Sequence, residues 1–132
     1  NTFDQLPDPR SALRASLAML RTNGVLALRV PNGECYARWR GRLGASPPRG
    51  GFGTRLLAHN NLLTFPYRYG FTPASLTRLL REIGFEILKI VPDVLVPTSD
   101  EWTRRWAALE ERLFKPLTKR WSPWFEVYAF SA

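Results

Sequence analysis

Two segments of the chain share one pattern, and this repetition constrains the fold more than any other feature of the sequence. Each segment opens with a helix-capping side chain followed by proline, Asp8-Pro9 in one and Thr72-Pro73 in the other. Apolar residues at spacings of three and four then predict a helix with one buried stripe in each segment. The stripes are Leu13, Leu17 and Leu20 in the first, and Leu76, Leu79, Leu80 and Ile83 in the second.

A helix stop and a short apolar run follow each predicted helix. Asn23-Gly24 and Gly84 are suited to the left-handed conformation that ends a helix. Residues 25–30 are a nearly continuous apolar run, which is typical of a strand covered on both faces. Residues 85–91 alternate as a strand does, and Pro92 is expected to end that strand. The chain therefore contains two helix-to-strand units in succession.

A third strand closes the chain. Residues 124–130 are apolar except for Glu126, so we expect most of this run to be buried. Helices packed on a mostly buried sheet indicate the α/β class.

Two further helices and one loop complete the predicted elements. Residues 36–43 have helical spacing, and a capping box from Thr98 to Glu101 opens another helix, which Pro116 ends. Glycine and proline crowd residues 44–53, which predicts a loop.

Length and composition fit one folded domain. The chain has 132 residues, 45% of them hydrophobic, and its apolar runs fall far short of the roughly 20 residues needed to cross a bilayer. We therefore expect no membrane partner. A single cysteine, Cys35, forms no internal disulfide, and with one histidine it cannot complete a closed zinc site. No metal is expected, and the predicted location is the reducing cytoplasm.

The charge balance leaves one alternative function open. The chain carries 19 Lys and Arg against 11 Asp and Glu, a net charge of +8, so its field could attract a polyanion. Five arginines are interleaved with Trp39 and Phe52, as in proteins that stack on bases. They are Arg38, Arg40, Arg42, Arg49 and Arg55. Because no recognition helix accompanies them, a basic α/β module binding nucleic acid is the less favoured hypothesis.

The single histidine lies in a polar and aromatic segment. His59 is accompanied by Asn60, Asn61, Tyr67 and Tyr69. Rings, amides and hydroxyls in this mixture can line a small-molecule pocket, and a surface loop packed on a helix is the alternative. The sequence contains neither the Gly-x-Ser-x-Gly elbow of hydrolases nor a phosphate-binding loop. It therefore supports neither a hydrolase nor a nucleotide-binding function.

Several of these segments, in this order, resemble one enzyme family. Residues 3–9 (FDQLPDP), the helix that follows, and residues 23–32 (NGVLALRVPN) resemble the second half of class I S-adenosylmethionine-dependent methyltransferases, in the branch that acts on small molecules. Residues 69–76 (YGFTPASL) and Gly84-Phe85 are similar to that family's Phe-Thr-Pro helix and its entry to the sixth strand. The similarity spans residues 3–91, and the last strand extends it to about residue 131.

The resemblance implies a fold and an activity. Residues 1–132 would be the C-terminal part of a Rossmann-like methyltransferase domain, with strands 5, 7 and 6 adjacent in that order, the last strand antiparallel, and a substrate-side insertion at about residues 33–70. The family's glycine-rich loop and ribose-binding acid would precede Asn1. The chain alone is then expected to be inactive without the N-terminal half of the domain. A non-catalytic relative kept for interactions is a further alternative.

The resemblance also implies the site residues. Asp4, Gln5 and Leu6 would lie beside the cofactor, S-adenosyl-L-methionine. The small-molecule methyl acceptor would contact Pro31, Asn32, His59, Tyr67 and Tyr69. Gln5 stands where the family usually has histidine, which leaves His59 as the candidate catalytic base.

Overall fold

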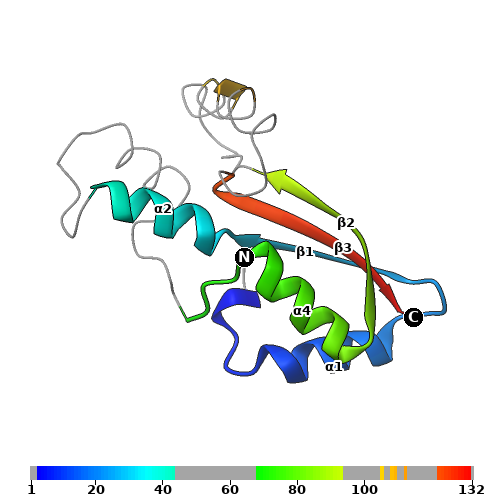
Figure 1. Ribbon diagram of the computed structural model, residues 1–132. Helices are drawn as coiled ribbons and strands as arrows, with labels where there is room; N and C mark the ends of the chain where they lie inside the picture. Colours follow the sequence, from blue (N-terminus) through cyan, green and yellow to red (C-terminus); the bar gives the residue numbers. More distant parts are fainter. Residues whose placement is uncertain are drawn as a thin grey trace.

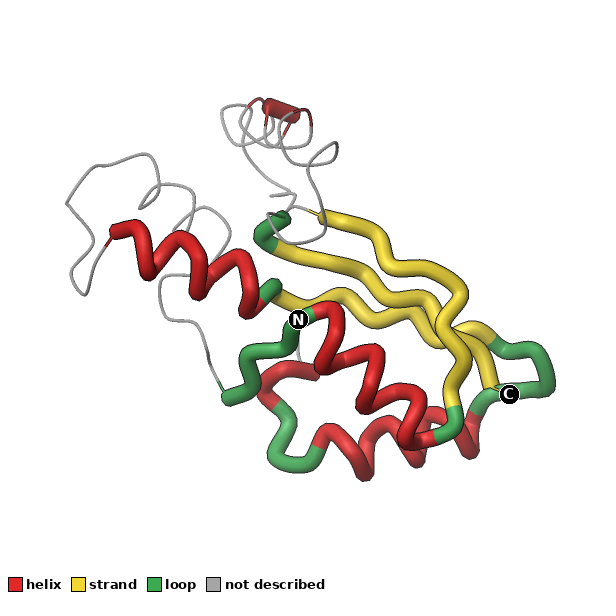
Figure 2. The backbone as a smooth tube through the Cα atoms, in the orientation of Figure 1, coloured by secondary structure: helices red, strands yellow, loops and turns green. Residues whose placement is uncertain are grey.

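The computed structural model describes residues 3–43, 68–93, 105, 108, 109, 112 and 122–131. Within these residues the protein is α/β, with a three-stranded sheet and helices packed against it (Figures 1 and 2). The elements are η1 (Phe3–Gln5), α1 (Pro9–Met19), β1 (Val25–Pro31), α2 (Gly33–Leu43), α4 (Pro73–Ile83), β2 (Phe85–Asp93) and β3 (Trp124–Ser131).

Both Pro-initiated helices begin where the sequence predicts. The Asp8 carboxylate accepts a hydrogen bond from the Ser11 backbone N–H at 3.0 Å and so caps α1. Thr72 and Ser75 exchange side-chain and backbone hydrogen bonds in a capping box that opens α4. These local signals are sufficient to set both helix starts.

The two helices end by different means. At the end of α4, Gly84 adopts φ 112° and its N–H donates to the Leu80 and Arg81 carbonyls, as predicted. In contrast, α1 ends at Leu20 in an extended conformation, and the left-handed residue of the following turn is Asn23, at φ 63°. Asparagine tolerates this region better than most residues because its short side chain can hydrogen-bond locally.

The last strand in sequence lies in the middle of the sheet. The strand order is β1-β3-β2, and β3 pairs antiparallel with both neighbours. The resemblance predicted that the last strand in sequence would lie between the other two and run antiparallel to them, and this order is confirmed. Since β1 and β2 run in the same direction, their carboxyl ends lie at the same end of the sheet (Figure 1).

The core lies between one face of the sheet and helices α1 and α4. Alternate residues of β3 point into this core, which confirms that most of the last apolar run is buried. Leu13 from α1 and two leucines from α4 pack against them. The buried core residues are Leu13, Val30, Phe71, Leu76, Leu80, Phe85, Phe125, Val127 and Ala129.

Three details differ from the sequence prediction. The first half of β1 is not covered on both faces, since Val25 is 52% exposed and burial is complete only from Val30 onward. Strand β2 does not end at Pro92 but continues to Asp93. β2 pairs only with β3 among the described strands, and an outer strand tolerates a missing N–H. Helix α2 starts at Gly33, three residues earlier than predicted.

Some predicted elements lie outside the described residues. They are the loop at residues 44–53 and most of the helix expected from Thr98. Arg105, Ala108, Leu109 and Arg112 of that segment are helical and exposed. No helix in the described part of the chain is both long enough and apolar enough to span a bilayer.

Candidate functional site

Three segments that are distant in the sequence meet at the carboxyl end of β1. The Tyr69 N–H donates to the Asp4 carbonyl at 3.1 Å, which joins η1 to the segment before α4. The Gly33 N–H donates to the Phe71 carbonyl at 2.8 Å, which joins the same segment to the start of α2. Ligand sites of open α/β sheets lie outside the carboxyl ends of strands, so this junction is the candidate site.

Close backbone approach at the junction requires glycine. A Cβ atom at position 33 would lie 2.8 Å from the Gly70 carbonyl oxygen, a distance that real Cβ atoms do not tolerate. Pro31 and Asn32 were expected to contact the methyl acceptor, and no role was predicted for Gly33. The glycine after a strand was the available signal, but its contact is with a residue 37 positions away.

Asp4 is the one acidic group buried in this junction. Its side chain is 1% exposed, and neither carboxylate oxygen has a hydrogen-bond partner among the described residues. Burial raises the pKa of the Asp4 carboxyl from its ordinary value, because desolvation disfavours the charged form. A buried, unpaired carboxyl is uncommon in folded proteins, and it is suited to accept a hydrogen bond or to face a cation.

Asn32 is fully buried and its side chain is occupied inside the fold. Its Nδ2 donates to the Ser122 carbonyl at 2.8 Å, and its Oδ1 accepts from the Glu34 N–H at 3.0 Å. Its own N–H donates to the Pro123 carbonyl at 2.8 Å. Asn32 thereby fixes the end of β1, the start of α2 and the entry to β3 together. In this position it shapes the site from within.

Tyr69 is fixed at both ends of its side chain. Its hydroxyl donates to the Pro7 carbonyl at 2.9 Å. Its ring stacks on Phe71 with 5.8 Å between centroids, and Phe71 stacks on Phe3 at 5.3 Å. These contacts hold η1 and the loop to α1 against the segment before α4. Phe3 and Phe71 thus shape the site, a role that was not predicted from the sequence.

The remaining residues expected at the site are only partly placed. Pro31 is buried beside Asn32, Leu6 is half-buried, and Gln5 is exposed. Of the site residues expected from the sequence, Asp4 and Tyr69 are in backbone contact, and Pro31 and Asn32 lie next to them through the Gly33 contact. His59 and Tyr67 lie outside the described residues.

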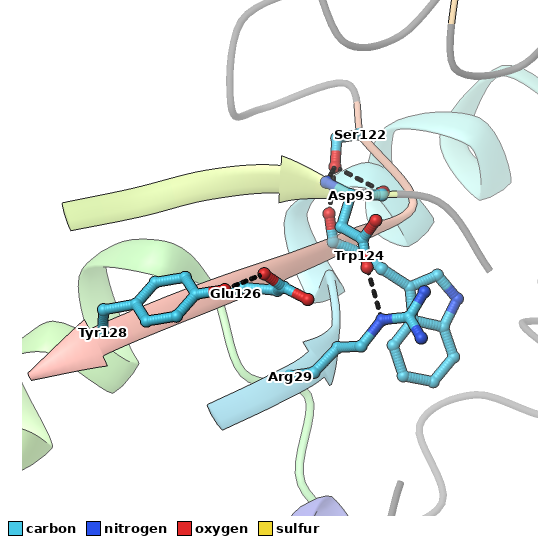
Figure 3. A network of polar contacts seen from close by, with 6 residues as sticks. All are labelled: Arg29, Asp93, Ser122, Trp124, Glu126 and Tyr128. Carbon is cyan, nitrogen blue, oxygen red and sulfur yellow. Dashed lines mark hydrogen bonds and ion pairs between the residues drawn. The ribbon is translucent and has the colours of Figure 1, made fainter. Parts of the chain in front are cut away.

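A second polar cluster lies on the sheet face that α1 and α4 do not cover (Figure 3). Arg29 forms an ion pair with Asp93, and its guanidinium carbon lies 5.6 Å from the centre of the Trp124 ring. The Tyr128 hydroxyl donates to Glu126 at 2.6 Å, and this carboxylate raises the tyrosine pKa. These groups are engaged with each other across three strands, so their evident effect is to stabilise the sheet.

The described residues also form a surface hollow at the other end of the sheet. It has a volume of about 430 Å³ and is lined by Arg81 of α4 and by residues 84–87 at the start of β2. Both charged side chains of this lining, Arg81 and Glu86, are exposed. The hollow therefore lacks the buried polar group that marks the carboxyl end of β1.

Neither a metal-binding cluster nor similarity to a known protein adds to the assignment of the candidate site at the end of β1. In the part of the chain that the structure describes, no three His, Cys, Asp or Glu side chains gather in a way that could hold a metal ion. No protein-family model matches the sequence, and no curated protein is significantly similar to it.

Proposed function

We propose that this chain is the C-terminal part of a Rossmann-like methyltransferase domain, which transfers a methyl group from S-adenosyl-L-methionine to a small molecule. The strand arrangement carries the proposal. Two helix-to-strand units followed by a reversed strand that inserts between them is the arrangement that the resemblance implies for this part of the domain. The family-like segments at residues 3–9 and 69–76 also lie at one end of this sheet, where a ligand would bind.

The residues at the junction fit a cationic cofactor. When bound, S-adenosyl-L-methionine supplies a methyl group on a positively charged sulfur, and transfer breaks the C–S bond and leaves its electron pair on sulfur. Asp4 offers a buried carboxylate without a partner among the described residues. Asp4, Gln5 and Leu6 are the residues of this chain that would hold the cofactor.

The contribution of this chain to catalysis is alignment. Holding donor and acceptor in an attack geometry supplies a large part of the rate in a two-substrate reaction. Asn32 fixes the end of β1 through Ser122, and Tyr69 fixes the η1 segment through Pro7. The acceptor would lie against Tyr67 and Tyr69, at the end of β1 that the buried Pro31 and Asn32 shape from within. If the acceptor carries a proton at the attacking atom, His59 is the residue proposed to take it.

The polyanion alternative gains no support from helix α2. Arg38 pairs with Glu34 at 3.1 Å, and Arg40 donates to the Tyr36 hydroxyl at 2.9 Å. These two arginines are therefore engaged along their own helix rather than arranged as a phosphate-binding row.

The test begins with the coding sequence upstream of Asn1. We expect about 100 further residues that contain a strand, a Gly-x-Gly-x-Gly loop and a strand-ending acid, as dinucleotide-type folds require. The complete protein is then expected to bind S-adenosyl-L-methionine in isothermal titration calorimetry. A complete protein without that loop and without cofactor binding would contradict the proposal. Binding to polyanions that weakens steeply with salt would favour the alternative instead.

The role of His59 has its own test in the complete protein. The His59→Ala variant should retain cofactor binding and lose methyl transfer if the histidine takes the acceptor's proton. Full activity of this variant would remove His59 from the mechanism and leave the fold assignment untouched.

A further inference from the structure

We draw no further inference here: the strongest candidate, the exposed face of the sheet around Val25 and Ala27 that α1 and α4 leave uncovered, carries none, because nothing in the structure shows what covers it.

Discussion

At the scale of single residues, Asp4 and Asn32 show opposite ways of burying a polar side chain. Asn32 is 0% exposed, and both ends of its amide are hydrogen-bonded within the fold. Asp4 is buried as deeply, but its oxygens have no partner among the described residues. A satisfied group supports the structure, whereas an unsatisfied one weakens it and is more readily explained by binding.

This contrast predicts that removing the Asp4 charge stabilises the protein. The raised folded-state pKa means that the folded protein holds its proton more tightly than the unfolded chain does. Stability is therefore lost as the pH rises through that pKa, and it is regained on acidification. We expect Asp4→Asn to unfold at a higher temperature than wild type at pH 7, and the difference to vanish below about pH 4. Thermal unfolding followed by circular dichroism at several pH values measures both.

A control with the opposite sign is available at Asp8. The Ser11 N–H lowers the pKa of this exposed cap, so Asp8 stabilises the fold above its unfolded pKa and stops doing so as the pH falls. Asp8→Ala should therefore unfold at a lower temperature than wild type at pH 7. If Asp4→Asn also unfolded at a lower temperature there, the carboxylate would have a stabilising partner and the argument for a ligand would collapse.

At the scale of elements, the sequence predicts whatever depends on neighbouring residues. The caps at Asp8 and Thr72 and the glycine at position 84 act within one turn of their helices, and all three are where the pattern places them. Helix α2 starts three residues before its predicted position. The hydrogen bond from the Glu34 N–H to the Asn32 Oδ1 at its start is local, so Asn32-Gly33 was an available signal that the spacing of residues 36–43 did not include. The bond from the same side chain to Ser122, 90 residues away, is one that local patterns cannot reveal.

The two glycines at positions 84 and 41 separate a required glycine from a dispensable one. A Cβ at Gly84 would lie 3.5 Å from Leu17, an ordinary contact, so any cost of Gly84→Ala comes from its φ of 112°. We expect a loss of about 1 kcal/mol or more from this strain. Gly41 lies in α2 with open space around its Cβ position, so Gly41→Ala should stabilise by up to about 1 kcal/mol. Urea unfolding of the two variants measures both changes.

If Gly84→Ala and Gly41→Ala changed the free energy of unfolding in the same direction, this account of the two positions would be contradicted. A gain in stability for Gly84→Ala would mean that the end of α4 can relax out of its left-handed conformation. A loss for Gly41→Ala would mean that α2 packs against another part of the chain at that point.

At the scale of the whole molecule, the sequence could predict the layers and not the site. Two helix-to-strand units and a third apolar run imply a covered sheet, and the single charge of the last run predicts that most of it is buried, as it is in β3. The order β1-β3-β2 was expected only through the resemblance, since periodicity does not say which strands pair. The contact of Gly33 with Phe71 and that of Tyr69 with Asp4 join segments far apart in sequence, and no local pattern reports them.

The position of β3 makes the end of the chain the most sensitive part of the fold. Because β3 pairs with both other strands, a defect in it is felt across the whole sheet, whereas β1 pairs with β3 alone among the described strands. Val127 in β3 is 1% exposed and Val25 in β1 is 52% exposed, so the same substitution can be compared at both places.

We expect Val127→Ala to lower the free energy of unfolding by about 2 kcal/mol, because it removes buried methyl groups and leaves a cavity between the sheet and α4. Val25→Ala should cost less than about 1 kcal/mol, since half of that side chain already contacts water. Urea unfolding of both variants under the same conditions gives the comparison. Equal losses would mean that another part of the protein covers the face of the sheet near Val25, as helices cover both faces of the sheet in the complete domain of the methyltransferase proposal.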